Sequence, residues 1–135
     1  MVVKIKGADV EYLGKLEGGR WLICGGRHFT DWEEMGTALD GLVHHFGKPD
    51  TVIHGGAAGA DTLAGMWAIA RGVQTEVFEA DWSLGKAAGM IRNQEMIDHG
   101  KPTIVIGFEG GKGTSDMMER ARRAEIAVAR VVKEE

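Results

Sequence analysis

Four short apolar runs, each followed by a loop of small or polar residues, constrain the fold more than any other feature of this chain. They span residues 21–24, 51–54, 75–78 and 103–108, and segments of helical length separate them. A last strand is expected over residues 127–132. Strands that alternate with helices indicate βαβ units and a parallel sheet, and uninterrupted apolar runs are typical of strands covered on both faces. The sequence therefore predicts an α/β fold, a single three-layer domain with a mostly parallel central sheet.

Helical periodicity fills the segments between these strands. Thr30 and Glu33 form a capping-box pattern, in which Thr30 would accept from a backbone amide and Glu33 would reach back to the start of the first helix. Further helices are expected over about residues 60–71, over about 85–98 and from about Ser115 onward. The residues expected in the core, because of their helical spacing, are Trp32, Met35, Leu39, Leu42, Val43, Phe46, Leu63, Met66, Trp67, Ala70, Met117, Met118, Ala121 and Ala124.

The start of the chain precedes this alternating pattern. Alternation over residues 2–6 and 10–13, around Gly7-Ala8-Asp9, predicts a short β-hairpin. We therefore expect an N-terminal hairpin extension over residues 1–19 and one α/β domain over residues 20–135, because 135 residues suit one ordinary domain.

Composition limits the setting in which the chain works. Cys24 is the only cysteine, so no disulfide forms within the chain, and no stretch has the apolar length of a membrane span or signal peptide. We therefore expect a cytoplasmic protein without a membrane partner. The net charge of -4 weighs against nucleic acid as the main partner, because duplex-binding domains carry a basic excess or a basic face. The sequence leaves the oligomeric state open, a homo-oligomer included.

Glycine is about twice as frequent as usual, with 21 residues against an ordinary share of roughly 7%. The glycines cluster where apolar runs end, over residues 25–26, 55–59 and 110–113. In α/β folds these strand ends form the edge at which ligands bind. Glycine lets the backbone amides at a helix N-terminus approach an anion, although a single cluster can equally serve a tight turn. Three clusters on one edge favour binding of a phosphate or carboxylate.

Two familiar phosphate motifs are incomplete. A P-loop would need a glycine where Ile106 stands, and Gly113 separates Lys112 from Thr114. The loop over residues 55–60 lacks the spacing of the dinucleotide-binding fingerprint. We therefore expect neither a Walker-type triphosphatase nor an ordinary dehydrogenase. No cofactor is required by the sequence, and a nucleotide or an NAD-derived molecule is the class of ligand that remains.

Several motifs match a known pattern when they are taken in order. They are Gly25-Gly26-Arg27, Ile53-His54-Gly55-Gly56-Ala57-Ala58-Gly59-Ala60-Asp61, Ala80-Asp81-Trp82, Gly85-Lys86-Ala87-Ala88-Gly89, Arg92-Asn93 and Gly110-Gly111-Lys112-Gly113-Thr114. Over about residues 20–132 the chain resembles the YspA-like (cpYpsA-related) family of the SLOG superfamily. That superfamily includes the LOG cytokinin-activating phosphoribohydrolases and the DprA DNA-processing proteins. The resemblance implies a Rossmann-like fold that binds nucleotides or nucleotide-derived molecules.

The resemblance leaves catalysis open. LOG enzymes carry G-G-x-G-T-x-x-E, whose glutamate works with an arginine on the sugar–base bond. Here the pattern starts at Gly110, and Met117 occupies the glutamate position. Arg92 resembles the LOG arginine, and Asp81 ranks first as a substitute acid. We expect a domain that binds, senses or processes its ligand, with little LOG-type hydrolysis of nucleoside monophosphates. The alternatives are an N-glycosidic hydrolase of nucleotide-like substrates and, disfavoured by the acidic composition, a DprA-like nucleic-acid role.

Side chains near the loops suggest specific contacts, each with a structural alternative. Arg27 follows two glycines at a strand end, where it can fork onto a phosphate or form a surface ion pair. Asp61 can accept from ribose hydroxyls or cap a helix, and Trp82 can stack on a base or pack. Thr114 and Ser115 are natural N-cap residues.

The remaining candidates have weaker signals. Cys24 is expected in the core instead of acting as a nucleophile, and His54 either approaches the ligand or packs. No histidine has metal-ligand spacing to a cysteine or carboxylate pair, so no metal is expected. The expected catalytic residues are Asp81 and Arg92. The expected ligand-binding residues are Gly25, Gly26, Arg27, His54, Gly55, Gly56, Ala57, Gly59, Asp61, Trp82, Lys86, Arg92, Asn93, Gly110, Gly111, Lys112, Gly113 and Thr114.

Overall fold

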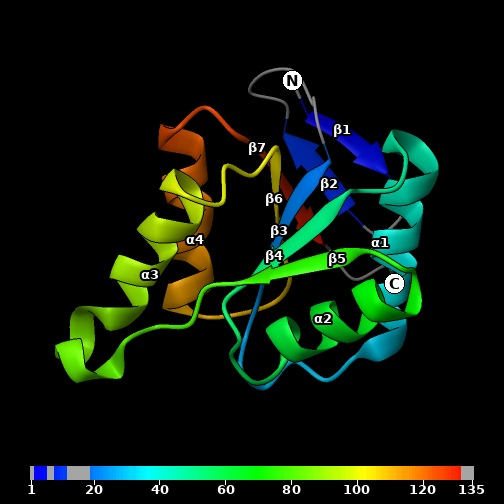
Figure 1. Ribbon diagram of the computed structural model, residues 1–135. Coiled ribbons are helices and arrows are strands. Elements are labelled where there is room, and N and C mark those ends of the chain that lie inside the picture. Colours follow the sequence, from blue (N-terminus) through cyan, green and yellow to red (C-terminus); the bar gives the residue numbers. More distant parts are fainter. Residues whose placement is uncertain (1, 6–7, 12–18, 132–135) are drawn as a thin grey trace.

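The computed structural model describes residues 2–5, 8–11 and 19–131, which form one seven-stranded sheet with helices on both faces (Figure 1). The strands are β1 (Val2–Ile5), β2 (Ala8–Glu11), β3 (Arg20–Cys24), β4 (Thr51–His54), β5 (Gln74–Val77), β6 (Ile104–Gly107) and β7 (Ala127–Val131). The helices are α1 (Trp32–Phe46), α2 (Ala60–Ala70), the 3-10 helix η1 (Trp82–Ala87), α3 (Ala88–Asp98) and α4 (Lys112–Arg123). The predicted Rossmann-like α/β fold is confirmed.

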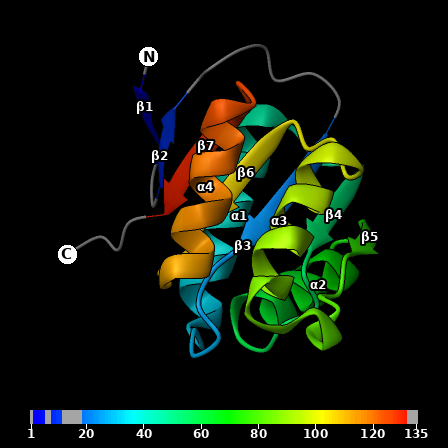
Figure 2. The ribbon, with the colours of Figure 1, turned by 90° about the vertical axis from the view of Figure 1, so that its left-hand side faces the viewer.

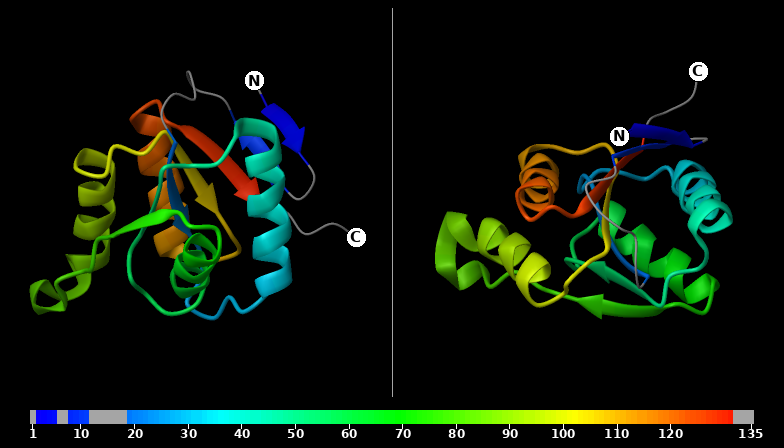
Figure 3. Two further views of the ribbon diagram at one scale, coloured as in Figure 1. Left: turned by 45° about the vertical axis from the view of Figure 1, so that its right-hand side comes forward. Right: turned by 90° about the horizontal axis from the view of Figure 1, so that it is seen from above.

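Five neighbouring strands, in the order β7-β6-β3-β4-β5, make up the parallel part of the sheet. The chain enters this part at β3, extends to β5 on one side, and then crosses back to β6 on the other side of β3. The connections after β3 and β6 lead to α1 and α4, which lie on opposite faces of the sheet (Figure 3). In α/β sheets such a switch point opens a crevice at the carboxyl ends of the two strands. The topology therefore favours a ligand site between the ends of β3 and β6.

A short antiparallel hairpin extends the parallel strands at one edge. β1 pairs with β2, and β2 pairs in turn with β7, so that Ala8 lies opposite Val131. The predicted hairpin is therefore confirmed, except that Ala8 and Asp9 belong to β2 instead of the turn. Residues 6–7 and 12–13 of the predicted hairpin, and residue 132 of the predicted last strand, lie outside the described residues. The division of the chain after residue 19 stays a prediction.

Successive residues of β3 alternate between two cores. Trp21 and Ile23 pack in the core beneath α1 and α2, whereas Leu22 and Cys24 pack in the core beneath α3 and α4. Figure 2 shows α3 and α4 side by side over the second of these faces. Trp67 from α2 is fully buried and stacks on Trp21, with ring centroids 6.2 Å apart. Burial on both faces is the reason that β3, β4 and β6 have nearly uninterrupted apolar sequences. The outermost parallel strand, β5, is mostly exposed, so the expectation that residues 75–78 form a doubly covered strand is wrong.

Helix α1 begins differently from the predicted capping box. Its N-cap is Asp31, and the Asp31 carboxylate accepts a hydrogen bond from the amide of Glu34 at 3.0 Å. The predicted roles of Thr30 and Glu33 are therefore wrong. The helix begins one residue later than that pattern assumes, so Asp31 is the residue whose side chain can reach the third amide of the helix.

Four residues that helical spacing assigned to the core are exposed instead. The exposed fraction is 40% for Trp32 and 51% for Met66, and Ala70 and Ala124 are also exposed. Trp32 and Ala70 are terminal residues of their helices, and Ala124 follows the end of α4, so none of the three is enclosed by neighbouring turns. Met66 lies on the side of α2 opposite to the buried Ala64.

In the described residues, no helix is long and apolar enough to cross a bilayer.

Candidate functional site

The loops after β3, β4 and β6 meet at the carboxyl ends of the parallel strands, at the bottom of Figure 1, as their common position after apolar runs predicts. Together with η1 and α3 they line an open cavity of about 760 Å³. The predicted site residues that line it are Gly25, Gly26, Arg27, Ala57, Asp61, Trp82, Lys86, Arg92, Asn93, Gly110, Gly111, Gly113 and Thr114. Those that do not line it are His54, Gly55, Gly56, Gly59, Asp81 and Lys112. The cavity thus lies at the switch point between β3 and β6.

Gly26 connects the three loops. Its amide donates to the carbonyl of Glu109 at 2.8 Å, and its carbonyl accepts from the amide of Ala60, at the start of α2, at 3.1 Å. Gly59, with φ at +79°, lies so close that a Cβ atom there would overlap the backbone of Gly26 and Arg27. Close contact between loops therefore requires several of these glycines, because only a residue without Cβ permits such an approach.

Helix α4 has an uncapped first turn at the cavity. It begins at Lys112 with Gly111 as its N-cap, so the expected start near Ser115 is wrong, and Thr114 and Ser115 lie inside the helix instead of capping it. No side chain caps this end, and among the described residues the amides of Lys112, Gly113 and Thr114 have no acceptor. Unpaired amides combined with the positive end of a helix dipole attract anions.

The loop after β4 uses its amides differently. The Asp61 Oδ2 atom accepts from the amides of Gly55 at 3.1 Å and Ala57 at 3.2 Å, and His54 Nδ1 accepts from the amide of Gly56 at 3.1 Å. Asp61 therefore organises this loop and does not cap α2. Because protein atoms already accept from these three amides, this loop has no unpaired amides at 55–57 for an anion.

Burial controls the titration of the buried groups beside the cavity. It raises the pKa of Asp61, although the Ala57 amide and the charges of His54 and Arg92 act in the opposite direction. Burial lowers the pKa of His54, so the neutral ring keeps a lone pair on Nδ1 for the loop, while the Asp61 charge opposes this shift. Burial also raises the pKa of the Cys24 thiol, which makes it a poor nucleophile.

Arg92 reaches the cavity from α3. Its Nη1 atom donates to the carbonyl of Gly55 at 2.8 Å and, at 3.4 Å, to that of Phe78, and its Nε atom donates to Asn93 Oδ1 at 3.3 Å. Among the described residues Nη2 has no acceptor, so it is available to a ligand. A Cβ atom at Gly55 would overlap the guanidinium, so this glycine provides the space that Arg92 occupies. Arg92 and Asp61 thus hold the same loop from two sides.

Trp82 and Arg27 contact each other at the edge of the cavity. The Arg27 guanidinium carbon lies 5.3 Å from the centroid of the Trp82 ring, a distance typical of cation–π contacts. Both side chains are exposed. The predicted helix over residues 85–98 begins instead at Ala88 as α3, and residues 85–87 belong to η1, in which Gly85 has φ at +78° and interrupts the helical backbone. Trp82 is the first residue of η1 and lines the cavity.

Three residues considered for catalysis do not line the cavity. Asp81 caps η1, and its Oδ1 atom accepts from the Ser83 amide at 3.1 Å and the Ser83 hydroxyl at 2.6 Å. Met117 is fully buried between α4 and the sheet. Asp116 is directed toward Asn93 and Arg120, as its position one helical step from Met117 predicts. The carboxylate-bearing residues that do line the cavity are Asp61 and Glu109.

Sequence reasoning missed several cavity residues. They are Cys24, His28, Phe29, Gly89, Met90, Met96 and Glu109. Gly89, Arg92, Asn93 and Met96 follow the spacing of one helical face. Once Arg92 was a candidate, its neighbours three and four residues away could have been added on that basis. His28 and Phe29, which follow Arg27, and Glu109, which precedes Gly110, carried no such signal.

Comparison with known proteins identifies the family. The sequence profile of the YspA, cpYpsA-related SLOG family matches residues 20–85, which include the loops after β3 and β4. Gene 61 protein of Mycobacterium phage D29 is 37% identical to the chain over 117 residues, which cover 81% of this chain and 93% of that protein. No solved structure matches the chain significantly. The chain belongs to the YspA, cpYpsA-related SLOG family.

Proposed function

We propose that the cavity binds a nucleotide-derived ligand whose phosphate lies at the N-terminal end of α4. The observation that carries this proposal is the uncapped first turn of α4, where Gly113 and Thr114 line the cavity opposite the glycine loop after β3. Backbone amides at such a helix end are a common phosphate site in α/β proteins. Membership of the SLOG family supports a nucleotide-related role. A cytoplasmic location is part of this proposal.

The order of the strands supports one orientation of the ligand. At the carboxyl ends of the strands, α4 follows β6, α2 with Asp61 in its first turn follows β4, and η1 with Trp82 at its start follows β5, while β3 lies between β6 and β4. A phosphate at α4 would therefore bring the ribose toward Asp61, whose carboxylate accepts from hydroxyls, and the base toward Trp82. Arg92 Nη2 and Arg27 supply positive charge. The volume of about 760 Å³ suits a small molecule, because such sites span roughly 300–1,000 Å³.

An N-glycosidic hydrolase is the second candidate, and one observation favours it. Asp61 is a buried carboxylate in the cavity wall, and burial raises its pKa, which is a common property of catalytic acids. Two observations count against the LOG route. Met117, at the position of the LOG glutamate, is buried in the core, and Asp81 is engaged in capping η1. We therefore rank binding or sensing of the ligand above hydrolysis.

Isothermal titration with AMP, adenosine, ribose 5-phosphate and ADP-ribose tests the proposal. If α4 holds the phosphate, AMP binds more tightly than adenosine by about tenfold or more, because a hydrogen bond to a charged group contributes about 1.5–3 kcal/mol. Chromatography of the same samples measures base release and so separates binding from hydrolysis. Equal affinities for AMP and adenosine would refute the phosphate site. Absence of binding by all four compounds would refute the proposed ligand class.

A further inference from the structure

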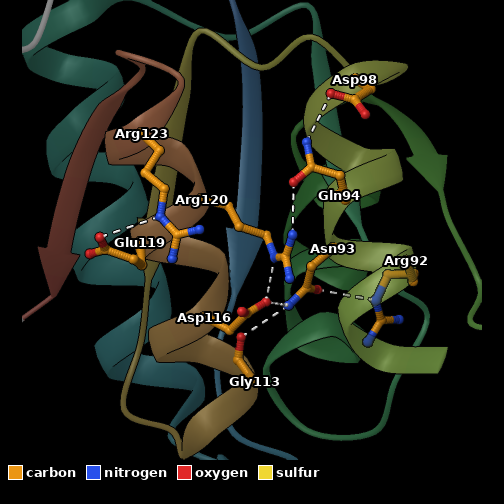
Figure 4. Close-up of polar contacts among 9 residues, drawn as sticks. All are labelled: Arg92, Asn93, Gln94, Asp98, Gly113, Asp116, Glu119, Arg120 and Arg123. Carbon is orange, nitrogen blue, oxygen red and sulfur yellow. Dashed lines mark hydrogen bonds and ion pairs between the residues drawn. The ribbon is translucent and has the colours of Figure 1, made fainter. Parts of the chain in front are cut away.

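Asn93 lies in the cavity wall, yet other parts of the protein already engage its side chain. The residue is buried, with 6% of its surface exposed. Its Nδ2 atom donates to the carbonyl of Gly113 at 3.2 Å and to Asp116 Oδ2 at 3.0 Å, and its Oδ1 atom accepts from Arg92 Nε at 3.3 Å (Figure 4). Both amide protons and the carbonyl oxygen are therefore in use. A direct contact with a ligand would break or share one of these bonds.

The first of these bonds fixes a peptide unit in the first turn of α4. The carbonyl of Gly113 and the amide of Thr114 belong to one planar peptide group, and they point in opposite directions. Holding the carbonyl toward α3 therefore sets the direction of the Thr114 N–H group. That amide is one of the unpaired donors at the cavity. Asn93 thus acts on the predicted phosphate site without touching it.

The hydrogen bond from Arg92 Nε to Asn93 Oδ1 fixes the orientation of the Arg92 guanidinium in the cavity. Arg92 is held at Nε by Asn93 and at Nη1 by the carbonyl of Gly55. Two anchored nitrogens determine the plane of the guanidinium, because the group is rigid and flat. The direction of the remaining nitrogen, Nη2, is therefore determined as well. That nitrogen has no acceptor among the described residues.

The hydrogen bond from Asn93 Nδ2 to Asp116 determines which end of the Asn93 side chain faces α4. Asp116 accepts from Arg120 Nε at 2.7 Å as well as from Asn93. Burial alone would raise the pKa of Asp116, but the hydrogen bonds from Arg120 and Asn93, together with the charges of Arg120 and Arg123, outweigh it, so the pKa is lowered and the carboxylate stays ionised. An ionised acceptor requires the NH₂ end of Asn93 on this side, which leaves the oxygen for Arg92.

We propose that Asn93 is a positioning residue that joins the first turn of α4 and the Arg92 guanidinium into one anion-binding unit. In the described part of the chain, Asn93 is the side chain that hydrogen-bonds to both elements. The proposal rests on the proposed function, because it assigns Thr114 N–H and Arg92 Nη2 to the phosphate of the same ligand. It predicts that Asn93 matters for the charged part of the ligand and not for its neutral part.

The test compares Asn93→Ala with the control Gln94→Ala in titrations with AMP and adenosine. Gln94 is the next residue of α3 and accepts from Arg120 in the same polar network, but in the described part of the chain its side chain hydrogen-bonds to neither Gly113 nor Arg92. We expect Asn93→Ala to bind AMP about tenfold or more weakly, since two donors to a charged group lose their alignment, with its affinity for adenosine unchanged. Gln94→Ala should bind both compounds as the wild type does.

Every other outcome contradicts either the positioning role of Asn93 or the phosphate site at the start of α4. Equal losses for AMP and adenosine in folded Asn93→Ala would show a general structural role and overturn the inference, as would no loss for AMP. If Asn93→Ala does not fold, Asn93→Ser gives the same comparison, and failure of both variants to fold would also establish a structural role. If the wild type binds AMP no more tightly than adenosine, the phosphate site itself is refuted.

Discussion

The Arg27 guanidinium lies over the ring of Trp82, with 5.3 Å between the guanidinium carbon and the ring centroid. The two residues come from the loop after β3 and from η1, so this contact joins two elements at the cavity edge. An exposed aromatic ring beside a cationic group can accept the flat face of a nucleobase. The contact therefore leads to a prediction about the base end of the ligand.

Trp82→Ala should weaken AMP binding by about tenfold, because stacking on a base contributes about 1–3 kcal/mol. Its affinity for ribose 5-phosphate, which has no base, should stay the same. Trp32→Ala is the matched control, because Trp32 is another partly exposed tryptophan that does not line the cavity. Titration calorimetry measures both affinities. A similar loss for both ligands in Trp82→Ala would contradict a stacking role.

Asp61→Asn should alter how stability depends on pH. Burial raises the pKa of Asp61 above its ordinary 3.8, so the folded chain holds a proton that the unfolded chain releases first. The stability contributed by Asp61 is therefore greatest below pH 3.8 and declines as pH rises through the folded pKa. The asparagine side chain of the variant does not ionise, so we expect the free energy of unfolding of the variant, minus that of wild type, to increase across this range.

Urea unfolding at a series of pH values measures this difference. His54 and Arg92 are the charged groups that act on Asp61. The variant changes the protonation of His54 only above the folded pKa of Asp61, because below it the wild-type Asp61 carries no charge either. A difference that stays constant with pH, or that decreases as pH rises, would show that burial of Asp61 does not control its ionisation.

Gly110→Ala should destabilise the protein by about 1–3 kcal/mol, the usual cost of forcing an extra methyl into a packed site. A Cβ atom there would overlap Thr114 Oγ1 and would lie 2.8 Å from the amide nitrogen of Gly26. Gly111→Ala is the matched control, because a Cβ atom at position 111 meets nothing within 4 Å. Thermal or chemical unfolding distinguishes the two. Equal stability of both variants would mean that the contact between the two loops is unimportant.

Met117→Glu should destabilise the protein without creating hydrolytic activity. Met117 is fully buried, and burying an unpaired carboxyl costs several kcal/mol. The new side chain would replace one that packs against the sheet and does not line the cavity. Measurement of adenine release from AMP by wild type, Met117→Glu and Asp81→Asn tests this. Adenine release by a folded Met117→Glu variant would contradict the placement of Met117 outside the cavity. Rapid adenine release by the wild type that Asp81→Asn leaves unchanged would contradict the expectation that the wild type hydrolyses AMP poorly.

The fold could be predicted from the sequence because its central strands, β3, β4 and β6, are buried on both faces. Residues 104–106 are all apolar, and glycines mark the carboxyl ends of such runs. Helix ends were harder to predict, since they depend on local hydrogen bonds. Asp31 and Thr30 are both good N-cap residues, and only the folded backbone shows which carboxylate or hydroxyl reaches an amide. The same holds for α4, whose N-cap is a glycine without a capping side chain.

The site was predictable as a set of loops but not as a set of interactions. Three glycine clusters suggested similar roles, yet the amides at residues 55–57 bond to Asp61 and His54, while those at the start of α4 are unpaired. Sequence spacing contains no information on which way a peptide group points. The same limit applies to Asn93, whose partners come from α3 and from α4, a helix about 20 residues further along the chain.

Titration of AMP into Gly113→Asp tests the central claim, that the first turn of α4 holds the phosphate. A Cβ atom at Gly113 meets nothing within 4 Å, so the variant should fold while its carboxylate repels the phosphate. Gly36→Asp, at a position of α1 that is equally open and does not line the cavity, is the control. The account predicts loss of AMP binding in Gly113→Asp alone. Wild-type affinity for AMP in a folded Gly113→Asp variant would contradict it.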